Sequence, residues 1–108
     1  MVEAEKRLRV VLAGRRKALP PTSPDIAWAL ANLGEALIGQ RRAKDAEPLL
    51  REALAIEQKA LPEDSYEVGT ASGLLGEALA GQKRFKDAEP LILRGANNLL
   101  ASSRTTLF

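Results

Sequence analysis

Residues 34–50 read GEALIGQRRAKDAEPLL, and residues 76–92 read GEALAGQKRFKDAEPLI. The two stretches lie 42 positions apart, and 13 of their 17 positions are identical. Chance does not produce such a match, so the chain contains an internal repeat with a period of 42 residues. A fixed period of roughly 20–50 residues is typical of stacked repeat architectures, and it therefore decides the fold class.

The repeat extends toward the N-terminus, beyond these two stretches. KALP at 17–20 returns at 59–62, and Ser23 corresponds to Ser65. The length of 108 residues fits one domain. We divide this domain into a half-unit (1–21), two full units (22–63 and 64–103) and a tail (104–108).

Each full unit is predicted to form two antiparallel helices, A and B, which gives the order B-A-B-A-B along the chain. Ser23 and Ser65 can cap free backbone N–H groups, so they predict where the A helices begin. Apolar residues then recur at helical spacing on one face. The first A helix is expected to end near Gly39 and Gln40.

The B helices are expected to follow tight turns, the first of them at residues 41–43. Pro48 is expected near the first turn of its helix, where a missing N–H matters least. The corresponding helix of the second unit is expected from about Lys86 onward.

Glycine occupies the same place inside both A helices, at Gly34 and Gly76. A mid-helix glycine costs about 1 kcal/mol relative to alanine, so its repetition predicts a packing reason. We expect the B helix to approach the A helix backbone closely there. Small residues stand at the facing positions of the B helices, namely Ala46, Ala53, Ala88 and Gly95.

The composition argues against catalysis and metal binding. The chain has no Cys and no His, so it lacks thiolate chemistry and the commonest general base and metal ligand. No nucleophile–base set or phosphate-binding glycine loop is apparent, and we expect neither an enzyme nor a cofactor. The charged start and the lack of a long apolar stretch predict neither a signal peptide nor a membrane span. A cytoplasmic location is expected.

The pattern Leu33-Gly34-x-x-Leu37, followed by Ala46, Leu50 and Ala53, resembles a tetratricopeptide repeat. The usual period of that family is ~34 residues. The period of 42, together with KDAEPLL and the KALP connection, is similar to the variety found in kinesin light chains. The resemblance covers roughly residues 4–100.

The resemblance implies an all-α, right-handed superhelix in which the A helices line a concave groove. Such proteins bind peptides or other proteins there and are not catalysts. Some positions depart from the family pattern. Arg41 and Lys83 stand where members often carry Gly, and Asn32 alone matches the Asn-rich groove of kinesin light chains. Ala31, Asn32 and Glu35 do not form the Lys/Asn/Arg clamp of chaperone-binding members, so neither known ligand type transfers.

The expected groove residues come from the second face of each A helix. Trp28 is either a binding hot spot in the groove or packs against the preceding helix near Val10 and Ala18. Glu35 and Glu77 lie one unit apart, and they either select a basic or polar ligand or are simply solvated. The full predicted set is Trp28, Ala31, Asn32, Glu35, Ile38, Thr70, Gly73, Leu74 and Glu77.

A series of basic residues raises the possibility of nucleic-acid binding. They are Arg15, Arg16, Lys17, Arg41, Arg42, Lys83 and Arg84. The aromatic residues that would stack on bases are missing, and we interpret most of these cations as complements to helix dipoles. Nucleic acid is therefore not the expected partner.

The two ends of the predicted array show no clear polar cap, although terminal repeats need one. The chain is then either a piece of a longer array or a protein that associates with itself, end to end or by exchanging a terminal helix. The first hypothesis for function is a protein- or peptide-binding scaffold, and the second is a self-assembly module. The residues predicted to mediate self-association are Leu8, Val11, Leu12, Leu91, Ile92, Leu99 and Leu100.

Overall fold

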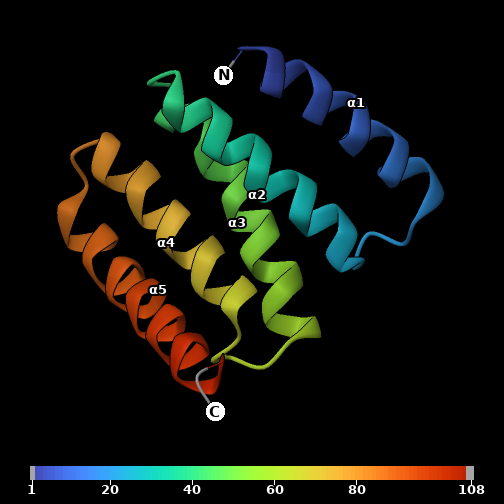
Figure 1. Cartoon of the computed structure of the whole chain (residues 1–108). Helices are drawn as coiled ribbons and strands as arrows, with labels where there is room; N and C mark the ends of the chain where they lie inside the picture. The colour runs from blue at the N-terminus through green and yellow to red at the C-terminus, as the bar shows by residue number, and fades with distance from the viewer. Residues whose placement is uncertain (1, 107–108) are drawn as a thin grey trace.

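Five helices follow one another in the computed structural model, which describes the backbone of residues 2–106 and the side chains of residues 2–102. They are α1 (Val2–Ala18), α2 (Pro24–Gly39), α3 (Ala43–Ala60), α4 (Tyr66–Gly81) and α5 (Phe85–Thr106). Figure 1 shows them stacked side by side in chain order. The predicted order B-A-B-A-B and the all-α helical repeat are confirmed, with α2 and α4 as the A helices.

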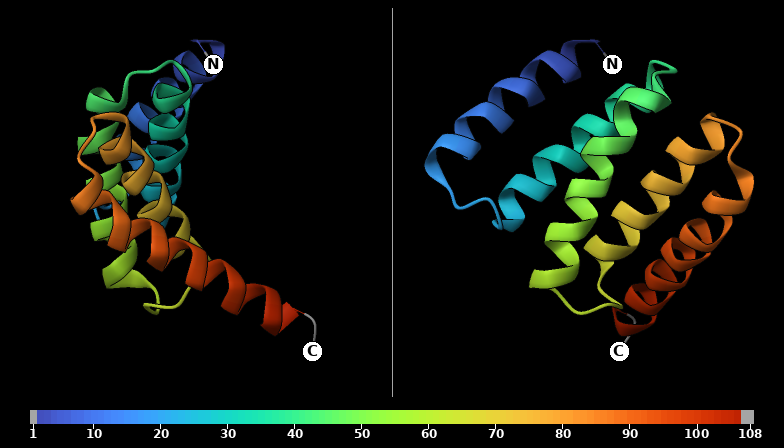
Figure 2. Two further views of the ribbon diagram at one scale, coloured as in Figure 1. Left: turned by 90° about the vertical axis from the view of Figure 1, so that its left-hand side faces the viewer. Right: turned by 180° about the vertical axis from the view of Figure 1, so that it is seen from behind.

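The helices form two layers. In Figure 1, α2 lies in front of α3, whereas in the view from behind α3 lies in front of α2 (Figure 2, right). The C-terminal part of α5 extends beyond the stack, on the side of α2 and α4 (Figure 2, left). The A helices therefore share one face of the molecule, and α5 borders that face.

Serine caps set the start of each A helix, as the sequence predicts. The Ser23 hydroxyl accepts a hydrogen bond from the backbone N–H of Asp25 at 3.2 Å. The Ser65 hydroxyl accepts one from the backbone N–H of Val68 at 3.2 Å. Pro24 occupies the first helical turn, where it leaves no hydrogen bond unmade.

The A helices end in left-handed turns at Arg41 and Lys83, whose φ angles are 61° and 62°. The Arg41 N–H donates to the Ile38 carbonyl and the Arg42 N–H to the Leu37 carbonyl, at 2.9 and 2.8 Å. This pair of bonds is the Schellman motif, which usually places glycine at the left-handed residue. Arg41 and Lys83 thus adopt a backbone conformation that is unfavourable for side chains with a Cβ.

The prolines of the B helices lie deeper than the sequence analysis predicts. Because α3 begins at Ala43, Pro48 falls in its second turn, and Pro90 takes the same place in α5. The prediction of a first-turn position is wrong. Both prolines are exposed, so water can reach the backbone carbonyl that each leaves without its helical donor.

Close helix packing explains the repeated glycines. A Cβ added at Gly34 would lie 2.6 Å from the Leu50 side chain, and one at Gly76 would lie 2.6 Å from Ile92 Cγ1. A Cβ at Gly95 would lie 2.8 Å from the Gly69 carbonyl oxygen. The predicted approach of A and B helices at these positions is confirmed.

A recurring polar cluster joins each B helix to the A–B turn of the following unit. One oxygen of Glu5 accepts hydrogen bonds from the Gln40 amide and the Arg42 guanidinium, both at 3.0 Å. The Gln40 bond, followed by that from Arg9, lowers the pKa of Glu5. The same contacts recur one unit later at 2.9 Å, between Glu47, Gln82 and Arg84. We call this arrangement the inter-unit cluster.

The ends of the array differ from expectation. Leu12 is buried, and Leu8 and Val11 pack against the core, because α2 covers the inner face of α1. These three side chains, which are predicted to mediate self-association, are thus covered within the chain, and their role in self-association stays a prediction. Val2 and Val10 are the exposed apolar residues of α1.

At the other end, α5 continues to Thr106, so residues 104–106 of the predicted tail are helical. Leu91 is half-buried against the core, whereas Ile92, Leu99 and Leu100 are exposed. The last two residues of the predicted tail, 107–108, lie outside the described part of the chain.

Candidate binding groove

Three adjoining hollows run across the face that the A helices share. The α4–α5 hollow has a volume of about 380 Å³, the central hollow between α2 and α4 about 280 Å³, and the hollow bordered by α1 about 370 Å³. Tyr66 and Thr70 line both of the first two, while Trp28, Glu57 and Glu67 line both of the last two. The hollows are thus continuous, and we call them together the A-helix groove.

All but one of the residues predicted for the groove line either the central hollow or the α4–α5 hollow. Trp28, Ala31, Asn32, Glu35 and Thr70 line the central hollow. Thr70 also lines the α4–α5 hollow, together with Gly73, Leu74 and Glu77. Ile38 lines none of the three and instead packs, half-buried, against the core. The role of these residues in binding stays a prediction.

Trp28 is 53% exposed and forms part of the groove wall. The guanidinium carbon of Arg15 lies 5.0 Å from the centroid of its ring, within the range of a cation–π interaction. Val10 is 74% exposed and Ala18 is also exposed, whereas Arg15 of the same helix lies over the ring, so Trp28 contacts the preceding helix through Arg15 and also forms part of the groove wall. Arg15 holds the indole in place while much of its surface remains open.

Glu35 and Glu77 are exposed, and neither forms an ion pair with a described residue. They line different hollows. Each therefore offers an accessible carboxylate to a separate part of the groove.

The basic residues are largely engaged within the molecule. Arg16 forms a two-pronged ion pair with Glu52, with both N–O distances 2.9 Å. Arg42 and Arg84 belong to the inter-unit clusters. Arg15, Arg16 and Lys17 lie in the last turn of α1. Arg41, Arg42, Lys83 and Arg84 lie directly beyond the C-terminal ends of α2 and α4, where their backbone N–H groups bond the last carbonyls, and the helix-dipole interpretation stays a prediction for them.

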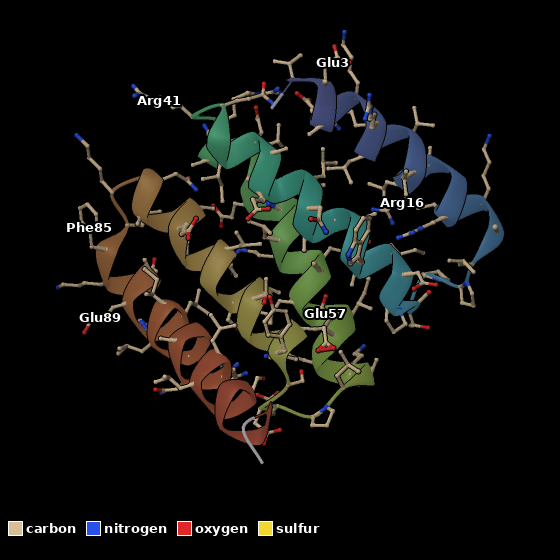
Figure 3. The ribbon with its side chains drawn as sticks, viewed as in Figure 1. Glu3, Arg16, Arg41, Glu57, Phe85 and Glu89 are labelled. Carbon is tan, nitrogen blue, oxygen red and sulfur yellow. The ribbon has the colours of Figure 1, made fainter. Side chains whose placement is uncertain are left out.

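Glu57 is a groove residue that the sequence analysis missed, as are Tyr66 and Glu67. Glu57 belongs to α3, is only 5% exposed, and has a carboxylate oxygen, Oε2, that accepts no hydrogen bond from any described residue. Burial raises the pKa of Glu57 to about 7, and the negative charge of Glu67 adds to the effect. Figure 3 labels Glu57 where α3 runs between α2 and α4.

A signal for Glu57 exists in the sequence. It stands at helical spacing from Leu50, Leu54 and Leu61, so it interrupts the apolar face of its helix. The equivalent residues of the other B helices are Arg15 and Leu99, which shows that the repeat itself does not require a carboxylate here.

The described residues contain no group of three or more His, Cys, Asp or Glu side chains arranged to hold a metal ion. Within the same part of the chain, no helix combines the length and apolar character needed to cross a membrane. The groove is lined by an aromatic surface, carboxylates and small apolar side chains.

Helix pairs that repeat every 42 residues and stack through small residues define a helical-repeat protein with a groove on one face. The family model described as tetratricopeptide repeat matches residues 25–99, and the chain belongs to this family. Proteins of the family are non-catalytic repeat scaffolds that generally mediate protein–protein interactions. The comparison with curated proteins finds no match.

Proposed function

We propose that this protein is a non-enzymatic scaffold that binds a peptide segment of another protein in the A-helix groove. The observation that carries the proposal is the half-exposed Trp28 in the wall of the A-helix groove. Tryptophan is among the residues that most often dominate binding energy, particularly where neighbouring side chains hold it in position. Arg15 provides that support.

The groove suits an extended or helical peptide better than a small molecule. Its three hollows adjoin one another along the face, and the largest has a volume of only about 380 Å³. A small-molecule site normally encloses most of its ligand in one deep pocket. A chain of shallow hollows instead matches a series of side chains along a peptide.

The proposal is tested with peptides selected from a random-sequence display library on the intact chain. Trp28→Ala is expected to weaken the selected peptides by about 30-fold, which corresponds to the ~2 kcal/mol of a hot spot. Phe85→Ala is the matched control, because Phe85 is an equally exposed aromatic residue that lies outside the groove (Figure 3). Peptides that are sensitive to Phe85→Ala and insensitive to Trp28→Ala would contradict the proposal.

We further propose that the chain is of the kinesin-light-chain-like variety and that it acts in the cytoplasm. The 42-residue period and the KDAEPLL segment support the first point. The groove does not follow the Asn-rich pattern of kinesin light chains, because Leu74 stands one unit after Asn32. Its ligand is therefore of a different chemical kind.

A second candidate function is self-assembly through α5. Its exposed apolar side chains support this function, and they are Phe85, Ile92, Leu93, Leu99 and Leu100. Light scattering over a range of concentrations tests it, with a rise in mass expected for the native chain and a smaller rise for Leu93→Asp. A monomer mass at every concentration would exclude this function.

A further inference from the structure

Glu57 is an unsatisfied acid at the floor of the central hollow. Its side chain is almost completely buried, yet its Oε2 atom accepts no hydrogen bond from the described residues. A buried carboxylate without a partner is costly, and such groups are normally paired or hydrogen-bonded. Other shielded carboxylates of this protein meet that rule, since Glu5 and Glu47 each accept bonds from an amide and from guanidinium groups.

The charges around Glu57 are mostly negative. Glu67 of α4 lines the same two hollows as Glu57, namely the central hollow and the hollow bordered by α1. Glu35 of α2 lines the central hollow, and Asp25 lines the hollow bordered by α1. None of these four carboxylates forms an ion pair with a described residue. The field in this part of the groove therefore favours a positive ligand.

One cation, Arg15 of α1, faces the same region, but it is already engaged. Its Nη1 atom donates to the Asp25 carbonyl oxygen at 2.6 Å, and its guanidinium lies over Trp28. The other polar side chains that line the central hollow, Asn32, Tyr66 and Thr70, carry no positive charge. The chain thus supplies the aromatic and acidic parts of a cation site without supplying the cation.

We propose that the central hollow, with Glu57 at its floor and Trp28 and Glu67 at its walls, binds the cationic end of a lysine or arginine side chain of the partner peptide. This inference rests on the proposed function of the groove and adds the chemistry of one ligand position. A volume of about 280 Å³ is at the lower end for ligand pockets, which suits one long side chain. An acidic side chain would meet the carboxylates of Glu35, Glu57 and Glu67, and an apolar one would leave Glu57 unpaired.

Binding of this cation is coupled to the protonation of Glu57. The pKa of Glu57 is raised to about 7, so near neutral pH the free protein holds a mixture of the neutral and ionised forms. A bound ammonium or guanidinium group stabilises the ionised form and releases the proton. Affinity for the cation is therefore expected to fall as the pH is lowered through about 7.

The test uses the single Trp of the chain as a reporter, because Trp28 gives one indole N–H resonance by NMR. The probes are the N-acetyl methylamides of arginine, lysine and norleucine, of which the last lacks the positive charge. Arginine and lysine probes are expected to shift the Trp28 resonance saturably, and the norleucine probe is expected to bind about tenfold more weakly. Equal binding of norleucine, or no saturable shift with either cation, would overturn the inference.

Glu57→Gln keeps the shape of the side chain and removes its charge, and it is expected to weaken both cationic probes about tenfold. Lowering the pH from about 8 to about 6 should weaken them about fivefold in the native chain and leave Glu57→Gln unaffected. Glu89→Gln, which removes an exposed carboxylate of α5 outside the groove, should match the native chain. Glu67→Gln provides a second variant at the wall of the site, with a smaller loss expected. Native affinity in Glu57→Gln would overturn the inference.

The selected peptides separate this inference from the proposed function. Peptides that depend on Trp28, carry no basic residue and tolerate Glu57→Gln would overturn the cation site while supporting the groove. Saturable binding of the cationic probes without any selected peptide would support the cation site and count against the peptide-binding function.

Discussion

Replacing Glu57 with Gln is expected to stabilise the protein above neutral pH and to leave its stability almost unchanged in mild acid. The reason is that the folded protein favours the neutral form of this buried carboxyl, whose pKa is raised from 4.5 to about 7. The folded state therefore binds more protons than the unfolded state between these two values. Stability contributed by the neutral form is present below about pH 4.5 and is lost as the pH rises to about 7.

The size of the effect follows from the same two pKa values. At about 1.4 kcal/mol per pH unit, a rise from 4.5 to about 7 costs at most ~3 kcal/mol of folding free energy. Because Glu57 borders open hollows, water and relaxation reduce this cost, and we expect ~1–2 kcal/mol at about pH 8. The carboxylates of Glu5, Glu47 and Glu52 have lowered pKa values and act in the opposite direction, so the native profile alone does not isolate Glu57.

The assay is urea unfolding of the native chain and of Glu57→Gln at a series of pH values, with the difference in unfolding free energy plotted against pH. The difference should be small near pH 4.5 and should rise to its full size by about pH 8. Glu77→Gln removes one exposed carboxylate from the same face and measures the effect of net charge. A Glu57→Gln profile that coincides with the Glu77→Gln profile would refute the reasoning.

Four further substitutions test the packing and the turns, each by thermal or urea unfolding. Lys83→Gly should stabilise the protein by about 1 kcal/mol, because φ is 62° there; no gain would mean that the left-handed turn carries little strain. Ser72→Ala should stabilise it by about 1 kcal/mol, because the buried hydroxyl has no hydrogen-bond partner among the described residues, and a loss would indicate a hidden partner. Gly76→Ala should destabilise it by ~1–3 kcal/mol because its Cβ would meet Ile92, whereas Gly14→Ala, with nothing within 4 Å, should stabilise it by up to about 1 kcal/mol. Equal effects of the two alanines would contradict the packing argument.

The fold could be predicted from the sequence because the signals for it are local and occur twice. Ser23 and Ser65 begin the A helices as predicted, and Gly34 and Gly76 lie where neighbouring helices come close. The covering of Leu8 was not predicted, because periodicity identifies an apolar face without showing which neighbour lies against it. In this array each A helix packs against one B helix before it and one B helix after it.

The candidate site was predicted only in part. Trp28 and Glu35 could be assigned to the groove because the family resemblance indicates which face of an A helix is open. Glu57 comes from a B helix, and its importance depends on the absence of a hydrogen-bond partner for its Oε2 atom among the described residues. A missing interaction of this kind requires knowledge of every neighbour in space, which the spacing of residues along one helix does not provide.

The inter-unit cluster has a consequence for how such a chain can change in length. Glu5 and Glu47 are bonded to residues 35 and 37 positions further along the chain. Duplication or deletion of one whole 42-residue unit preserves the inter-unit cluster, because each glutamate acceptor again meets a glutamine and an arginine at the same separation along the chain. The chain can therefore gain or lose whole units and keep this type of contact between them. Glu89 is exposed on α5 at the position equivalent to Glu47, and it is the acceptor that a further unit would use (Figure 3).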